Sequence, residues 1–286
     1  MKKGLVLEGG AMRGLSTAGV IDVMMENGIE YDGGIGVSAG AAFGCNYKSK
    51  QIGRPLRYNT TYAKDPRYCS FRSLLFTGDL YGAKFCYDTL PKKLDVMDEE
   101  TYRANPMKFY IVATDVETGE AVYVELEDLS DEDMAFMRAS ASMPIVSRPV
   151  KIGDHAYLDG GISDSIPLKK FEEMGYEKNV VVLTRPAGYR KTPQPKIMST
   201  LLRKYPGVDK ALQKRHEVYN ETLDYIEERR KQGAAYVIAP PQALKIGRIE
   251  HNPEVMRNVY YLGRREGLRH LAAVKEFLQE NEENHE

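Results

Sequence analysis

The sequence predicts an α/β fold, in which a mostly parallel sheet is covered by helices and a helical C-terminal extension follows. The apolar run GLVLE (residues 4–8) has the length of a buried strand, and apolar residues then recur at helical spacing as far as Asn27-Gly28. GIGV (34–37) and AGAAFGCNYKSK (39–50) repeat this pair as a second strand and a helix of small residues. The order strand, helix, strand, helix favours a parallel sheet.

The middle of the chain adds further strands. KFYIVATDV (108–116) and AVYVEL (121–126) predict a strand pair joined by ETGE. DEDMAFMRASAS (131–142) predicts a helix with an acidic first turn, which suits the helix dipole. KIGDHAYLDGG (151–161) predicts a short hairpin, and NVVVLTRP (179–186) another buried strand.

Beyond Pro195 the sequence is mostly helical and charged, with one strand expected in GAAYVIAPP (233–241). The final helix carries a packing stripe of apolar and small residues: Met256, Tyr260, Gly263, Gly267, Leu271, Val274 and Leu278. The tail QENEENHE is expected to be solvated. Because the late strand can join the same sheet, we expect residues 172–286 to complete the globule that residues 4–171 begin.

Composition sets limits on function. The chain has 286 residues, of which 42% are hydrophobic and 28% charged, as in ordinary globular proteins. A net charge of −1 gives no electrostatic case for nucleic acid. No apolar run approaches the ~20 residues that span a bilayer, and the start lacks a signal-peptide core, so we expect a cytoplasmic protein. The three cysteines include no C-x-x-C pair, so neither a disulfide framework nor a zinc site is expected.

The segment EGGAMRG (8–14) forms a glycine turn between the first strand and its helix. The unpaired N–H groups of that helix point back at the turn and stabilise a nearby anion. Two anions fit. One is a dinucleotide pyrophosphate, because Gly9, Ala11 and Gly14 approach the pattern G-x-G-x-x-G. Asp32 then has the place of the ribose-binding acid. The other is the oxyanion that forms when a nucleophile attacks an ester carbonyl.

Ser38 is the candidate nucleophile. It lies between Gly36 and Gly40 in the spacing G-x-S-x-G, which is typical of a serine on a sharp turn between a strand and a helix. In a parallel sheet this turn and the glycine turn both lie at the carboxyl ends of strands, where ligands bind. A nucleophile beside backbone donors forms an acyl-transfer site, whereas a dinucleotide site needs no exposed serine.

The residue that would accept the proton of Ser38 is less evident. The five histidines are His155, His216, His251, His270 and His285. None of them follows a strand in a suitable turn. Asp159 does follow an apolar pair, and it precedes Gly160 and Gly161. Partial burial would raise its pKa above the ordinary ~3.9 and let it accept the serine proton. The alternative is that Asp-Gly is simply a turn.

Together, GGAMRG, GVSAG and DGG, in this order, resemble the patatin-like phospholipases. ASASMP (139–144) is similar to a further stretch of that family, and the likeness covers roughly residues 4 to 171. The resemblance implies a three-layer α/β/α fold and hydrolysis of acyl esters in lipids, with no metal or other cofactor.

The resemblance also implies roles for single residues. Ser38 corresponds to the nucleophile and Asp159 to the proton acceptor of a serine–aspartate dyad. The oxyanion turn corresponds to Gly9, Gly10, Ala11 and Gly14, with Arg13 as the basic residue within it. Ala11 departs from the family, which usually has glycine there. If that position requires a positive φ, alanine adds strain of about 1 kcal/mol or more.

Some alternatives stay open at this stage. A dinucleotide-binding module and a non-catalytic regulatory protein of the same fold are the other function classes. Residues 70–91, with Leu75 and Phe76, supply an acyl pocket, a mobile cover or ordinary core. The charged clusters at 203–216 and 227–233 are either a transient membrane contact or a solvated helix face. The head group, acyl length and oligomeric state are not predicted.

Overall fold

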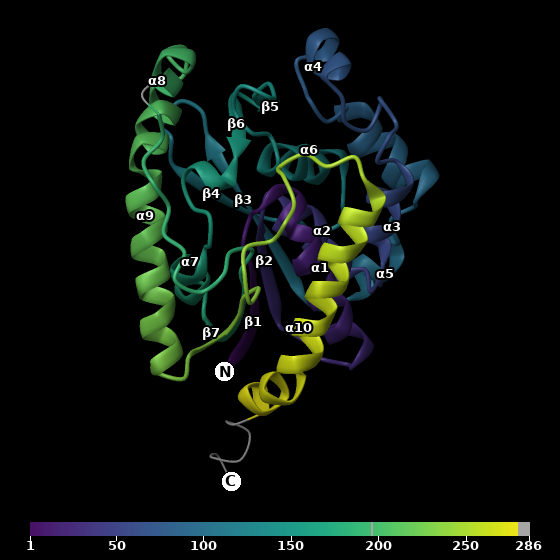
Figure 1. Ribbon diagram of the computed structural model, residues 1–286, viewed down its shortest axis with the longest axis vertical. Coiled ribbons are helices and arrows are strands. Elements are labelled where there is room, and N and C mark those ends of the chain that lie inside the picture. Colours follow the sequence, from purple (N-terminus) through teal and green to yellow (C-terminus); the bar gives the residue numbers. More distant parts are fainter. Residues whose placement is uncertain (196, 280–286) are drawn as a thin grey trace.

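A central sheet lies between two layers of helices in the computed structural model, which describes residues 1–195 and 197–279 (Figure 1). The strands are β1 (Lys2–Leu7), β2 (Gly33–Val37), β3 (Lys108–Asp115), β4 (Ala121–Glu125), β5 (Val150–Ile152), β6 (His155–Asp159), β7 (Tyr176–Val182) and β8 (Ala235–Ile238). Their order is β5-β6-β3-β2-β1-β7-β8, and β4 pairs with β3 outside this path. The predicted three-layer α/β/α fold is confirmed.

The sheet is parallel where the strand–helix alternation predicts it. β3, β2, β1, β7 and β8 pair in parallel, whereas β4, β5 and β6 join by antiparallel pairing. The strand pair at 108–126 and the hairpin at 151–159 are both present. The strand near residue 235 extends the sheet beyond β7, as the sequence predicts.

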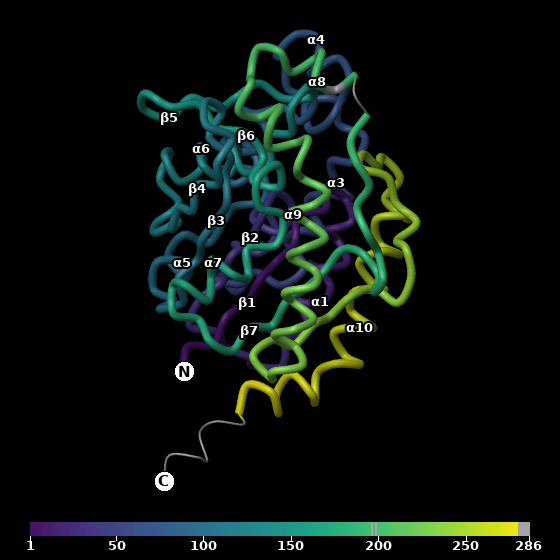
Figure 2. The backbone as a smooth tube through the Cα atoms, turned by 90° about the vertical axis from the view of Figure 1, so that its left-hand side faces the viewer, coloured from purple at the N-terminus to yellow at the C-terminus, as the bar shows by residue number. Residues whose placement is uncertain are grey.

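Helices cover both faces of the sheet. One face carries α1 (Gly14–Glu26), α2 (Ala39–Lys48), α3 (Arg54–Thr61), α5 (Glu99–Ala104), α6 (Asp131–Ser140) and α10 (Pro253–Gln279). The other carries α7 (Leu168–Glu173) and α9 (Pro206–Lys231), and α9 lies in front of the sheet in Figure 2. The short helices α4 (Phe71–Thr77) and α8 (Ile197–Leu201) lie at one end of the molecule in both views. The remaining helical segments are η1 (Ala11–Arg13), the π-helix η2 (Phe85–Leu94) and η3 (Gly160–Ile162).

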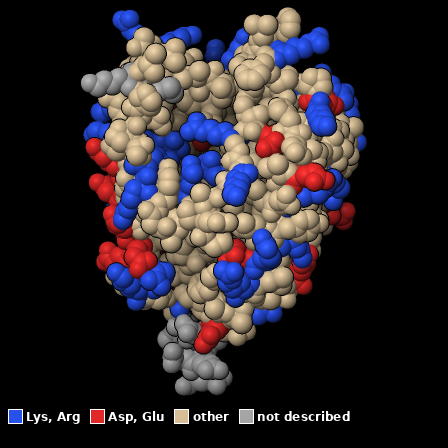
Figure 3. Space-filling model, in the orientation of Figure 1, with Lys and Arg blue, Asp and Glu red and all other residues tan. Residues whose placement is uncertain are grey.

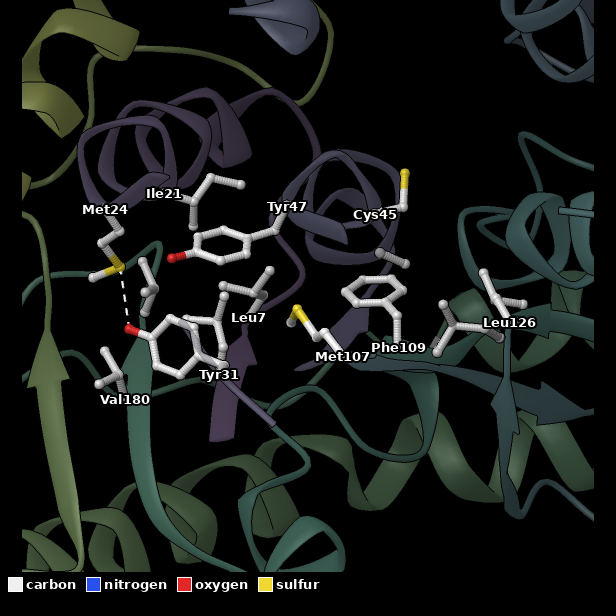
Figure 4. Packing of buried hydrophobic residues seen from close by; sticks show 14 of the residues in the cluster. Leu7, Ile21, Met24, Tyr31, Cys45, Tyr47, Met107, Phe109, Leu126 and Val180 are labelled. Atoms are coloured by element: carbon white, nitrogen blue, oxygen red, sulfur yellow. Dashed lines mark hydrogen bonds between the residues drawn. The ribbon is translucent and has the colours of Figure 1, made fainter. Parts of the chain in front are cut away.

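The core follows the two-residue period of the strands. Leu7 of β1 packs with Ile21 of α1 on one face of the sheet, in the cluster that Figure 4 shows. Val6, which points the other way, packs with Phe171 of α7. No helix within the described ranges is both long enough and apolar enough to cross a bilayer.

Glycines bring α10 directly against α1. A Cβ placed on Gly19 would lie 2.1 Å from the carbonyl oxygen of Tyr260, and one on Gly263 only 1.9 Å from that of Ser16. The two backbones therefore meet without side chains between them. The Tyr260 hydroxyl also donates to the buried Asp22 carboxylate of α1, at 2.5 Å. The predicted packing stripe of the final helix thus lies against α1, while most of the predicted tail (280–286) lies outside the described residues.

Candidate active site

Strands β2 and β6 end at the same place on β3. Val37, the last residue of β2, pairs with Val112, and Asp159, the last residue of β6, pairs with the next residue, Ala113. Since β4 pairs with residues 110–114 of β3 and so occupies its other edge, β2 and β6 share one edge and meet end to end. This register brings Ser38, which follows Val37, next to Asp159.

The Ser38 turn is strained. Ser38 has φ 55° and ψ −118° at the start of α2, a conformation that L-residues rarely adopt. Its flanking glycines allow the chain to pass closely. A Cβ on Gly36 would lie 2.4 Å from the carbonyl oxygen of Gly40, and one on Gly40 would lie 2.4 Å from that of Leu7. The two glycines of the motif are therefore needed for packing around the serine.

Asp159 is buried, with 5% of its surface exposed. Its carboxylate accepts a hydrogen bond, at 2.8 Å, from the Gly161 N–H, and the Ser38 hydroxyl lies close enough to it to lower its pKa. Burial raises the pKa of Asp159 above its ordinary value, although the Ser38 hydroxyl, the Gly161 N–H and the nearby Arg215 oppose the rise. The structure thus brings together the two residues that the sequence proposes as nucleophile and base.

Residues at the end of α6 hold the Ser38 and Asp159 turns in place by hydrogen bonds. The Ser38 N–H donates to the Ser140 hydroxyl at 3.0 Å, and the Asp159 N–H donates to the Ser142 carbonyl at 2.8 Å. Both serines belong to the ASASMP stretch. Sequence resemblance singles out this stretch but does not reveal that it links the two turns.

The glycine turn approaches Ser38 closely. A Cβ on Gly9 would lie 3.2 Å from the Ser38 Cβ. Within the described part of the chain, the N–H groups of Gly10 and Ala11 donate to no acceptor. Ala11 has φ 48°, so this position does require the left-handed region, at a cost of about 1–2 kcal/mol for a residue with a Cβ.

The other motif residues divide between the cavity and the packing. Arg13 lines the cavity, where its buried Nε has no partner among the described residues. Gly14, which was expected in the oxyanion turn, instead packs against α2, where its Cβ would lie 2.8 Å from that of Ala39. Gly160 packs against β3, with its Cβ position 2.1 Å from the Val112 carbonyl oxygen.

Ser38 opens onto a cavity of 690 Å³, a typical size for a small-molecule site. One end is apolar, lined among others by Phe43, Tyr58, Leu80, Tyr81, Leu90 and Met137. The interpretation of Leu75 and Phe76 as pocket residues is wrong, because α4 turns them to solvent, 79% and 74% exposed. Leu80 and Tyr81, from the same segment, do line the cavity.

The other end of the cavity is basic, and of its cations sequence reasoning had marked only Arg215, within the charged cluster at 203–216. It is lined by Arg185, Lys191, Arg215 and Arg248, all from the C-terminal region. The Arg215 guanidinium donates to the Gly161 carbonyl and so lies beside the Asp159 turn. No motif marks these residues, because they come from a loop, a helix and a second loop that meet only in the fold.

The alternatives to a serine–aspartate pair find no support in the geometry. None of the histidines within residues 1–195 and 197–279 lines the cavity, and His285 lies outside those ranges. Asp32 precedes β2 and accepts from the Lys3 N–H at 2.6 Å, at the opposite end of the strands from the glycine turn. It is therefore not placed to bind a ribose there. The same ranges contain no group of three His, Cys, Asp or Glu side chains that could hold a metal ion.

Two protein families match separate parts of the chain. Residues 5–171 match the family described as patatin-like phospholipase, and residues 205–279 match a domain of unknown function, DUF6363. The uncharacterized protein YjjU of Escherichia coli (strain K12) is 30% identical over 305 residues, which cover 96% of this chain and 79% of YjjU.

Two crystal structures show a more distant likeness. VipD from Legionella pneumophila has a TM-score of 0.47 at 12% identity, covering 95% of this chain and 67% of its own. The type III effector protein ExoU has a TM-score of 0.37 at 12% identity, covering 94% of this chain and 53% of its own.

The strain at Ser38 leads to a stability prediction. Ser38→Gly should be more stable than Ser38→Ala by about 1 kcal/mol or more, because only glycine relieves the positive φ. Urea unfolding of the two variants measures the difference, and Ser38→Ala serves as the matched control for loss of the hydroxyl. Equal stability, or a less stable glycine variant, would contradict strain at this turn.

Proposed function

We propose that this chain, which belongs to the patatin-like phospholipase family, hydrolyses acyl esters of lipids through an acyl-enzyme at Ser38. The observation that supports this most directly is the placement of Ser38 beside the buried Asp159 carboxylate, where β2 and β6 end on neighbouring residues of β3 and the hydroxyl lowers the pKa of the carboxylate. This pair lies beside the Gly10 and Ala11 N–H groups, which have no acceptor among residues 1–195 and 197–279, and opens onto a cavity with an apolar end suited to an acyl chain.

In the first half-reaction the Ser38 oxygen attacks the ester carbonyl carbon while Asp159 accepts the hydroxyl proton. The carbonyl oxygen becomes an oxyanion, and the N–H groups of Gly10 and Ala11 are the donors proposed to stabilise it. The ester C–O bond then breaks. The leaving alkoxide takes the proton from Asp159, and the acyl group remains on Ser38.

In the second half-reaction water replaces the alcohol. Asp159, again a carboxylate, accepts a proton from water as the water oxygen attacks the acyl carbon. The bond to Ser38 breaks, the serine oxygen recovers the proton from Asp159, and a fatty acid leaves. The raised pKa of Asp159 makes this carboxylate a stronger base than an exposed aspartate.

Removing either member of the pair should abolish turnover. Ser38→Ala should lower kcat/KM for a p-nitrophenyl ester by roughly 10³-fold or more, and Asp159→Asn by roughly 10²-fold or more. Only Ser38→Ala removes the residue that a fluorophosphonate labels. Asp154→Asn, an exposed aspartate in the β5–β6 turn, is the matched control and should keep full activity. Wild-type turnover in the Ser38 variant would refute the proposal.

The buried carboxylate also sets an acid limit to activity. As pH falls through the raised pKa of Asp159, the base becomes protonated and kcat/KM for a water-soluble ester should fall. The midpoint should lie above the ~3.9 of an ordinary aspartate. Circular dichroism at each pH checks that the protein stays folded. A midpoint at or below that ordinary value would contradict Asp159 as the buried base.

We further propose that one end of the molecule contacts a lipid surface. α4 and α8 expose large apolar side chains, which are Phe71, Leu75, Phe76, Ile197 and Leu201. Leu80, just after α4, and Pro195, just before α8, line the cavity. The exposed apolar side chains of α4 and α8 therefore border the opening of the cavity. The cluster at 227–233 is instead a solvated helix face, where Arg230 pairs with Glu227.

Polar replacement of the α4 side chains should weaken this contact. The combined Phe71→Ser, Leu75→Ser and Phe76→Ser variant should bind phospholipid vesicles at least roughly tenfold more weakly than the wild type, because even one such side chain buried in the lipid contributes about 1.5–3 kcal/mol. Hydrolysis of a water-soluble ester should not change. Leu268→Ser, at an exposed leucine of α10, is the control. Undiminished vesicle binding by the triple variant would rule out α4 as the contact.

A further inference from the structure

The cavity beside Ser38 has opposite characters at its two ends. Apolar side chains from α2, α3 and the segment after α4 line one end. Cations line the other: Arg13, Arg185, Lys191, Arg215 and Arg248. Figure 3 shows Lys and Arg side chains gathered around the hollow in the upper half of the molecule. We call Arg13, Arg185, Lys191, Arg215 and Arg248 the basic cluster.

The basic cluster has no direct ion pair with a carboxylate of the described residues. None of the five forms a salt bridge with a carboxylate of residues 1–195 or 197–279. Two other cations that line the same cavity are paired: Arg54 with Asp95 at 3.3 Å, and Lys92 with Asp131 at 2.8 Å. The unpaired charge is therefore confined to one end.

Aromatic rings hold part of the basic cluster in place. Arg185 lies 4.5 Å from the centre of the Tyr189 ring, and Lys191 lies 4.0 Å from that of Tyr219. The two rings pack edge to face, 6.0 Å apart. A cation held by a π-face stays positioned but keeps its charge for another partner.

The cations also repel one another. Burial, Arg215 and other cations of the cluster lower the pKa of Lys191 to about 7. Burial, together with Arg185 and Arg248, lowers the pKa of Arg13. Two carboxylates face the cluster. Glu8 accepts from the Thr184 N–H and the Tyr219 hydroxyl, and Asp159 is the partner of Ser38. An anion bound among the cations would relieve this repulsion.

We propose that Arg185, Lys191, Arg215 and Arg248 bind the phosphate of the substrate's head group, and so select anionic phosphate-bearing lipids over zwitterionic ones. This inference rests on the hydrolase proposed above and names its substrate class. Guanidinium groups match phosphate oxygens with paired, charge-assisted hydrogen bonds. A head group that also carries an ammonium would bring a like charge among the cations.

The position of Arg215 fits this role. Its guanidinium donates to the Gly161 carbonyl, and the Gly161 N–H donates to Asp159. The basic cluster therefore begins one residue from the base. In a glycerophospholipid the phosphate lies only a few bonds from the acyl ester, so a phosphate subsite has to adjoin the reacting groups.

The test compares lipids with one acyl chain and different head groups. Wild-type kcat/KM is measured below the micelle concentration for lysophosphatidic acid, lysophosphatidylcholine and monoacylglycerol. Lysophosphatidic acid should be preferred. In the Arg185→Gln, Arg248→Gln double variant the preference should fall by roughly tenfold or more, since a hydrogen bond to a charged group contributes about that factor. Arg257→Gln, at an exposed position of α10 outside the cavity, should keep the wild-type preference.

Titration calorimetry of ligand binding to the Ser38→Ala protein distinguishes a lipid head group from free phosphate as the ligand of the basic cluster. Lysophosphatidic acid should bind, and inorganic phosphate should bind at least tenfold more weakly, since it lacks the acyl chain. Equal binding of the two would assign the cluster to free phosphate and overturn the head-group proposal. A wild type with no preference for lysophosphatidic acid, or a preference that survives in the double variant, would also overturn it.

The same experiments distinguish failure of the subsite from failure of the hydrolase. Turnover of all three lipids at equal kcat/KM removes the subsite and leaves the hydrolase standing. If no lipid is cleaved and a fluorophosphonate does not label Ser38, the hydrolase fails, and lysophosphatidic acid binding to the Ser38→Ala protein still decides whether the cluster holds phosphate.

Discussion

The site depends on one constraint, the edge of β3 that two strands share. β2 runs parallel to β3 and ends opposite Val112, whereas β6 runs antiparallel and ends opposite Ala113. Since hydrogen bonds to β3 fix both strands, neither Ser38 nor Asp159 is free to move along this edge. A shift of one residue in either strand would reverse which face its side chains occupy, and would separate the hydroxyl from the carboxylate.

Close backbone packing follows from this arrangement. Two strands that meet end to end leave little room for the turns that leave them, and glycine occupies the tightest places. Gly40 lies against the Leu7 carbonyl, and Gly160 lies against the Val112 carbonyl. Ser38 and Ala11, the two residues with a Cβ and a positive φ beside these turns, carry the remaining strain. Backbone strain at a functional site persists only where the surrounding structure enforces it, and here the shared edge does so.

Much of this arrangement could be predicted from the sequence, because the motifs are local. A strand, a glycine turn and a helix lie within the first 26 residues, and the Ser38 turn repeats the pattern directly afterwards. The face that α4 presents was not predictable, since the crowding of apolar residues within the segment 70–91 does not say which of them turn inward. Leu75 points to solvent and Leu80 to the cavity, although five positions apart. The basic cluster was not predictable either, because no spacing connects Arg185 with Arg248.

The division of the site between two parts of the chain has a physical consequence. The family match ends at residue 171 and holds the reacting groups, whereas the aromatic rings and most cations of the basic cluster come from the loop after β7, from α9 and from the loop before α10. Arg215 joins the two parts, because its positive charge lowers the pKa of Asp159 while burial raises it. A phosphate bound to Arg215 would offset that charge and raise the pKa of Asp159 further, making it a stronger base. Under the proposed subsite, the head group would then affect the chemistry of Ser38 as well as the binding of the lipid.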